Sequence, residues 1–187
     1  EVKTATVDSV ELNEVQVTAA RYPQSLRSLA APVQLISSNM LQRISTGDLS
    51  SALASVPGVQ LQSGTFQTLK LTLRGIGSRS QYSTNRTRVY IDDIPLTGGD
   101  GTSVFDDLEL SFLSRAEITK GSYSAWYGSG MGGSLRFVSQ KASDKLFSAD
   151  AGATSGSFGL LKFLGMARSG FESGKLTVGL SHLSGDG

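Results

Sequence analysis

Cysteine is missing altogether from this sequence, and histidine occurs once. The absence of cysteine excludes disulfide bonds, thiol nucleophiles and thiolate metal ligands. His182 lies in a run rich in serine and leucine, without the neighbours of a catalytic triad. The acidic pairs Asp92-Asp93 and Asp106-Asp107 fall at expected turns, where carboxylates are usually solvated, and no calcium-loop pattern accompanies them. We therefore expect no enzyme, no metal site and no cofactor.

An excess of one charge and a long apolar run are lacking too. The 17 basic and 16 acidic residues nearly cancel, so nothing predicts nucleic-acid binding. No segment approaches the roughly 18 consecutive apolar residues of a membrane helix, which leaves strands of about ten alternating residues as the possible way to span a membrane. No basic segment followed by an apolar one opens the chain, so an exported protein would be present here in its mature form.

Glycine, in contrast, is abundant, with 22 residues against 4 prolines. One glycine run, residues 128–133, satisfies the dinucleotide-binding pattern G-x-G-x-x-G. That site requires a helix N-terminus for the phosphate, whereas residues 134–138 alternate as a strand. We interpret the run as a turn.

The first 30 residues show no core periodicity. Within them, residues 14–18 alternate like a short strand without a partner nearby. Such a segment can add its backbone to the sheet edge of another protein. A disordered tail is the alternative interpretation.

Residues 31–141 mix helical and strand patterns without strict βαβ order, which predicts an α+β domain. We expect a strand at 32–36, a helix beginning at Ser38 or Asn39, and a second helix that ends at Pro57-Gly58. The period is two in the expected strands 59–62, 69–74, 88–91, 115–120 and 135–138. Polar loops span 75–87 and 96–105.

Beyond residue 141 come three runs of about ten residues, at 146–155, 160–168 and 175–184, separated by glycine and serine. In the first run Phe147, Ala149 and Ala151 alternate with Ser148 and Asp150. This alternation is typical of a transmembrane β-barrel wall, and equally of an antiparallel sheet with one wet face.

Five segments follow one another along the chain: residues 13–21, 48–59, 73–75, 89–95, and a block from 116 to 133 that ends in Gly-Gly. In this order they resemble the TonB box, the "D-L-L…P-G-V" helix, the "I-R-G" strand end, the "V-x-I-D-G-V-P" strand and the last block of the plug in TonB-dependent outer-membrane receptors, in a form close to that of Bacteroidetes. The resemblance covers nearly the whole chain.

The resemblance implies three parts: an N-terminal segment with the TonB box at 1–30, a plug at 31–141, and the first three strands of an outer-membrane barrel at 142–187. Plugged barrels have about 22 strands, so we expect a longer chain. The implied function is TonB-dependent uptake of a siderophore, a cobalamin or a glycan across the outer membrane, with a periplasmic TonB-like transducer and outer-membrane lipid as partners. The alternative is a non-transporting module that only senses a ligand.

The resemblance also implies roles for particular residues. Asp93 stands where the family has glycine, so we expect a positive φ there, and Lys120 stands where the family usually has arginine. The residues expected to bind TonB are Glu14, Val15, Gln16, Val17 and Thr18; those expected to contact the ligand are Arg79, Tyr82, Asn85, Arg86, Asp100 and Phe105; and those expected to form a charge cluster with barrel glutamates are Arg74 and Lys120.

Overall fold

The computed structural model describes residues 16–17, 24–25, 31–44, 49–63, 69–77, 84–105, 108–121, 128, 130–142 and 146–186. Its elements, in chain order, are β1 (Gln16–Val17), β2 (Gln24–Ser25), β3 (Val33–Ser37), α1 (Ser38–Ile44), α2 (Leu49–Ala54), β4 (Val59–Ser63), β5 (Leu69–Leu73), β6 (Thr87–Ile91), β7 (Ile94–Pro95), the 3-10 turn η1 (Leu110–Phe112), β8 (Leu113–Lys120), β9 (Gly133–Ser139), β10 (Ser148–Ser155), β11 (Leu161–Phe171) and β12 (Gly174–Ser184). In the part of the chain so described, no helix is long and apolar enough to cross a membrane.

Five strands form a mixed sheet in the order β3-β8-β9-β6-β7. β6 and β9 run parallel, and the other neighbours are antiparallel. Because side chains alternate along a strand, Ala116 and Ile118 of β8 share one face with Leu135 and Phe137 of β9, and all four join the hydrophobic core. Leu53 of α2 belongs to the same core. The expected α+β fold is confirmed.

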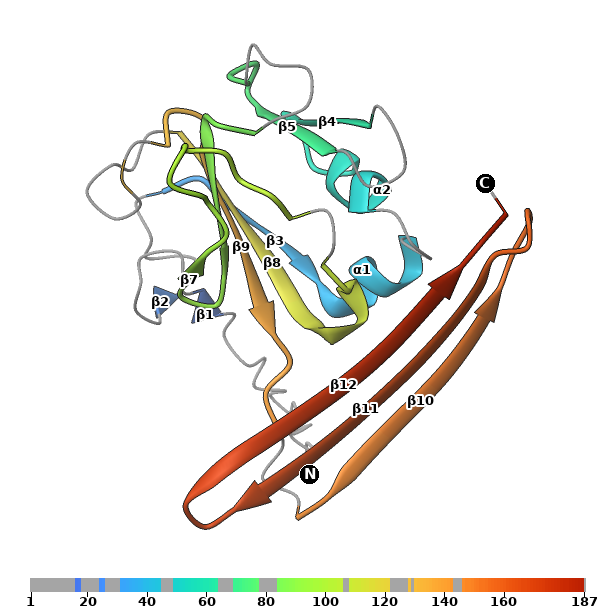
Figure 1. The fold of residues 1–187 in the computed structure, drawn as a ribbon. Coiled ribbons are helices and arrows are strands. Elements are labelled where there is room, and N and C mark those ends of the chain that lie inside the picture. The colour runs from blue at the N-terminus through green and yellow to red at the C-terminus, as the bar shows by residue number, and fades with distance from the viewer. Residues whose placement is uncertain are drawn as a thin grey trace, which may run out of the picture.

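A separate hairpin, β4–β5, lies beside α2 and apart from the mixed sheet (Figure 1). Its alternation buries Val59 and Leu71 in the core. The helix α2 ends at Ala54, earlier than the expected end at Pro57-Gly58. Gly58 lies in the turn that follows, with a φ of 74°, and its carbonyl accepts a hydrogen bond of 2.8 Å from the backbone nitrogen of Arg74. The hairpin is therefore tied to the helix through both packing and backbone.

The mixed sheet has two distinct ends. β6 and β9 both start at one end, at Thr87 and Gly133, which we call the loop end. They finish at the other end, the exit end, where the chain leaves β9 for the last three strands (Figure 1). Gly133 has a φ of 132°, and an added Cβ would lie 2.0 Å from the carbonyl oxygen of Thr119. The last glycine of the run thus begins β9, and a strand follows the run, as expected.

The last three strands form an antiparallel sheet in the order β10-β11-β12, which we call the wall sheet (Figure 1). Each strand alternates between two faces, as the sequence predicts. The outward face exposes Phe163, Val178 and Leu180. The inward face carries Lys162 and Met166, which are buried against the rest of the chain.

Candidate functional site

The segment expected to bind TonB is described at two residues, Gln16 and Val17. They form β1, which pairs antiparallel with β2 through Gln16 opposite Ser25 and Val17 opposite Gln24. Val17 is fully buried. The expectation that this strand has no partner nearby is therefore wrong, because a later part of the same N-terminal segment pairs with it. Glu14, Val15 and Thr18 lie outside the described residues.

The two polar loops meet at the loop end of the mixed sheet. Ser103 forms isolated bridges with both Thr84 and Thr97, and its backbone nitrogen donates to the Thr84 carbonyl at 2.7 Å. Asn85 is exposed and Arg86 half-buried at this junction. The structure thus brings two expected ligand residues onto one surface with the second loop. Arg79 and Tyr82 lie outside the described residues.

Asp100 stands at the exposed tip of the second loop. Its carboxylate accepts a hydrogen bond of 3.0 Å from the backbone nitrogen of Thr102. Hydrogen bonds from Thr102 hold the pKa of this carboxyl below its ordinary value, so the tip of the loop carries a negative charge at neutral pH.

Phe105 does not contribute to this surface. Its side chain is 2% exposed and belongs to the hydrophobic core, with its ring centroid 6.4 Å from that of Phe137. The expectation that Phe105 contacts a ligand is therefore wrong. The aromatic ring packs in the core, where it anchors the end of the loop, and is not presented to solvent.

Arg74 and Lys120, expected to form a charge cluster with barrel glutamates, lie close enough for the charge of Arg74 to act on Lys120. Lys120 ends β8, and its amine donates to the side-chain oxygen of Gln34 and to the carbonyl of Pro57. Burial, and then the positive charge of Arg74, lower the pKa of Lys120 from its ordinary value. Among the described residues neither cation is paired with a carboxylate. Within this part of the chain the two positive charges thus have no compensating carboxylate.

A contact that no sequence pattern indicated joins the wall sheet to the domain built around the mixed sheet, which we call the mixed domain. Glu109, just before η1, accepts hydrogen bonds from the Lys162 amine at 2.7 Å and from the backbone nitrogen of Ser111 at 3.0 Å. Both side chains of the ion pair are largely buried. Burial acts to raise the pKa of Glu109, but the hydrogen bonds from Lys162 and Ser111 outweigh it and lower the pKa below its ordinary value.

Two further contacts lie beside this ion pair. The Phe112 ring packs so closely on β12 that a Cβ added to Gly179 would lie 2.6 Å from its Cζ. Gln140, which follows β9, accepts a hydrogen bond of 3.0 Å from Arg168 of β11 and donates to the carbonyls of Ser111 and Leu113. We call this set of contacts the seam. The signal available in sequence was a lysine and an arginine on the inward face of an otherwise apolar or small-residue strand.

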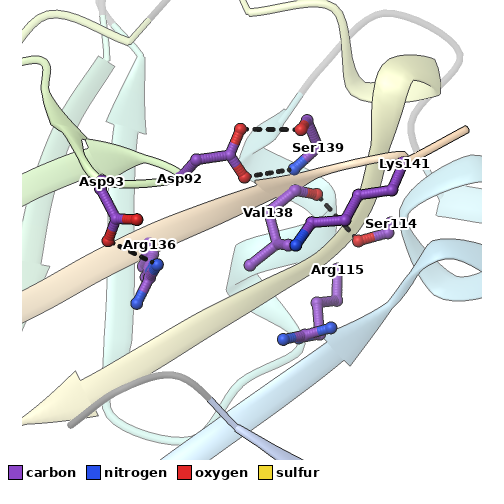
Figure 2. A pocket seen from close by; sticks show the side chains of 8 residues that line it. All are labelled: Asp92, Asp93, Ser114, Arg115, Arg136, Val138, Ser139 and Lys141. Carbon is purple, nitrogen blue, oxygen red and sulfur yellow. Dashed lines mark hydrogen bonds and ion pairs between the residues drawn. The ribbon is translucent and has the colours of Figure 1, made fainter. Parts of the chain in front are cut away.

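Charged residues gather at the exit end of the mixed sheet (Figure 2). The Asp92-Asp93 turn joins β6 to β7, and a φ of 52° is found at Asp92. The expectation of a positive φ at Asp93 is therefore wrong. Asp92 adopts this conformation because its carboxylate accepts from the backbone nitrogen and the hydroxyl of Ser139, while its own nitrogen donates to Phe137.

Four charged side chains form two ion pairs on the face of the sheet opposite the core. Arg136 pairs with Asp93 at 2.9 Å, and Arg115 pairs with Glu117 at 2.7 Å. Glu117 and Arg136 also lie opposite each other in the register of β8 and β9, and both are buried. In the described ranges, no three histidine, aspartate or glutamate side chains are grouped so that they could hold a metal ion.

Comparisons with known proteins agree on one family. A family model described as the TonB-dependent Receptor Plug Domain matches residues 25–134. The chain is 28% identical over 180 residues to the vitamin B12 transporter BtuB of Photobacterium profundum, covering 94% of this chain and 28% of that protein. It is 30% identical over 144 residues to an iron-regulated outer membrane virulence protein of Vibrio cholerae, covering 72% of this chain and 21% of the relative.

Solved structures share the fold. The siderophore receptor PiuA from Acinetobacter baumannii superposes with a TM-score of 0.67 at 22% identity, covering 92% of this chain and 23% of that one. The pyoverdine outer membrane receptor FpvA from Pseudomonas aeruginosa gives a TM-score of 0.71 at 15% identity, covering 91% and 24%. The chain therefore spans between a fifth and three tenths of the length of these proteins.

Proposed function

We propose that this chain, which belongs to the TonB-dependent receptor plug-domain family, forms part of an outer-membrane transporter for a scarce or bulky solute. It would supply the plug that closes the barrel and the first strands of the barrel wall. Its compartment is the cell outer membrane. The observation that carries the proposal is the seam, where Glu109 and Phe112 meet the inward face of strands whose outward face is apolar. A domain packed inside a membrane wall needs this arrangement.

The wall sheet supports contact with lipid. Four large apolar side chains lie on its outward face, and each is at least about half exposed: Phe163, Leu176, Val178 and Leu180. An apolar outward face and a polar inward face are the pattern of a strand wall in a bilayer. We place the parts of the chain at 1–30, 31–141 and 142–187, with the last part against lipid.

The loop end supports substrate binding. Asn85 and Arg86 offer amide and cationic groups at the junction of the two loops, and Asp100 offers an anionic group at the tip of the second loop. Arg79 and Tyr82 belong to the same stretch of sequence as Asn85 and Arg86. Relatives are named for vitamin B12 and siderophores. A siderophore, a corrinoid or a glycan fits this mixture of groups.

The N-terminal segment supports coupling to a TonB-like transducer. Residues 14–18 would pair with the transducer as an added strand, in which many backbone hydrogen bonds share the load. Because Val17 is buried and paired with Gln24, β1 must separate from β2 before it can pair with a strand of the transducer. A force that the transducer applies to β1 would then act on a plug that the seam holds against the wall sheet.

The test is uptake by cells that produce the full-length protein with Val17→Pro. Proline removes a backbone donor from the expected intermolecular ladder, so we expect uptake to fall to background while binding of the substrate to whole cells stays unchanged. Val10→Pro, in the same segment but outside residues 14–18, is the matched control and should transport normally. Loss of binding together with uptake would assign the strand to the fold instead, and binding without uptake in the unsubstituted protein would identify a sensing module.

A further inference from the structure

A cavity of about 340 Å³ opens at the exit end of the mixed sheet (Figure 2). It lies at the opposite end of the sheet from the junction of the two polar loops, and it is distinct from the expected substrate surface. Its lining comes from the turn after β6, the start of β8 and the end of β9 with the residue that follows: Asp92, Asp93, Ser114, Arg115, Arg136, Val138, Ser139 and Lys141.

Both carboxylates of this cavity already have a donor partner. Both carboxylate oxygens of Asp92 accept from Ser139, at 3.0 Å from its backbone nitrogen and 2.7 Å from its hydroxyl. Asp93 pairs with the Arg136 guanidinium at 2.9 Å. The Ser114 hydroxyl donates to the carbonyl of Val138 at 3.0 Å. The carboxylates therefore serve to fix the walls of the cavity.

The donor groups are not all engaged. Arg115 uses its Nε to bind Glu117 at 2.7 Å, and its two terminal nitrogens make no hydrogen bond to the described residues. Lys141 is exposed and likewise makes none within the described ranges. A guanidinium has five N–H donors and an ammonium three, so Arg115 and Lys141 keep several cationic donors that have no partner among the described residues.

We propose that this cavity is a binding site for a small anion with several oxygens, of which inorganic phosphate is the simplest probe. The terminal nitrogens of Arg115 present a planar fork that matches two oxygens of one anion, and Lys141 supplies a second point charge. The volume suits a small solute, since ligand pockets begin at about 300 Å³. A bound anion would connect β8 to the segment that leads from β9 into the wall sheet.

The experiment is isothermal titration calorimetry of the purified full-length protein with sodium phosphate, and separately with a short glutamate peptide. We expect saturable phosphate binding that weakens as sodium chloride is raised, because charge attraction is screened. Lys141→Gln should weaken binding at least tenfold. Arg115→Lys should do the same, because it keeps the charge beside the buried Glu117 and loses the fork. Lys70→Gln, which removes a cation from β5 outside the cavity, is the matched control.

Three outcomes would overturn the proposal. The absence of saturable phosphate binding at millimolar concentration would show that the cavity is not an anion site. An affinity lowered as much by Lys70→Gln as by Lys141→Gln shows general charge attraction to the protein surface. Binding of the glutamate peptide with no binding of phosphate assigns the cavity to a protein partner. None of these readouts depends on solute uptake, so the proposed transport function stands or falls separately.

Discussion

Glu109 and Lys162 stabilise each other in their charged forms where the mixed domain meets the wall sheet. The folded-state pKa of Glu109 is lowered, so the unfolded chain binds more protons at acid pH than the folded one. The stability that this pair contributes is thus fully present above the ordinary carboxyl pKa, and it is lost as the pH falls through the folded-state value. The pair therefore stabilises the protein at neutral pH, and its loss contributes to unfolding in acid.

We predict that Glu109→Gln lowers the melting temperature of the full-length protein at pH 7, and that this effect shrinks as the pH falls through the folded-state pKa of Glu109, where the carboxylate becomes protonated. Thermal unfolding between pH 7 and pH 3 measures this difference. Glu172→Gln, at the exposed turn between β11 and β12, is the matched control, and its curve should follow that of the unsubstituted protein. A constant difference between Glu109→Gln and the unsubstituted protein at every pH would contradict the role of the charge.

Single residues also show that local sequence patterns do not predict which distant residue a side chain contacts. The loop that contains Phe105 is rich in threonine, glycine and aspartate, which correctly predicts an exposed loop. The burial of its aromatic ring depends on Phe137, a residue of β9 that is distant in sequence. Lys162 is similar, because alternation assigns it to the inward face but cannot name Glu109 as the group it meets. Local pattern determines direction, and tertiary packing determines the partner.

At the scale of elements, the expected strands and helices were recovered because their periods are local properties. Leu49, Ala52 and Leu53 form one buried stripe on α2, and Leu71 and Leu73 one buried face on β5. The alternation at 14–18 predicts the strand that contains β1, but its pairing with β2 was not expected, since the two residues of β2 leave no period to detect. The 3-10 turn η1 is equally short, yet it supplies Phe112 to the seam.

The packing of η1 on β12 gives a prediction at this scale. Gly179→Val should push the Phe112 ring away from the strand, because even one added carbon would lie 2.6 Å from it, and the cost of overpacking is about 1–3 kcal/mol. Adding Phe112→Ala should recover part of that loss, and a double-mutant cycle on the free energy of unfolding measures the coupling. Gly152→Val, on β10 with nothing within 4 Å of an added Cβ, is the matched control. Costs that simply add would show that the two residues do not contact each other.

At the scale of the whole molecule, two parts with opposite requirements share one chain. The mixed domain buries its apolar side chains in a core, whereas the wall sheet presents Phe147, Leu176 and Leu180 outward. The wall sheet also ends in two strands, β10 and β12, each with one edge that pairs with no described strand. An apolar outward face next to open edges is stable when lipid covers the face and further strands continue the sheet.

Neighbouring residues on β12 allow this arrangement to be tested. Leu180 lies on the outward face and Ser181 on the inward face, so arginine at each position samples two environments one residue apart. A basic side chain on the lipid face of a barrel costs about 2–4 kcal/mol near the middle of the bilayer and less toward its surfaces. We predict that Leu180→Arg lowers the yield of folded full-length protein in lipid vesicles, measured by heat-dependent gel mobility, and that Ser181→Arg leaves it nearly unchanged. A sheet whose apolar face is wet would give the reverse order, because a charge at Leu180 would then be solvated and would reduce aggregation.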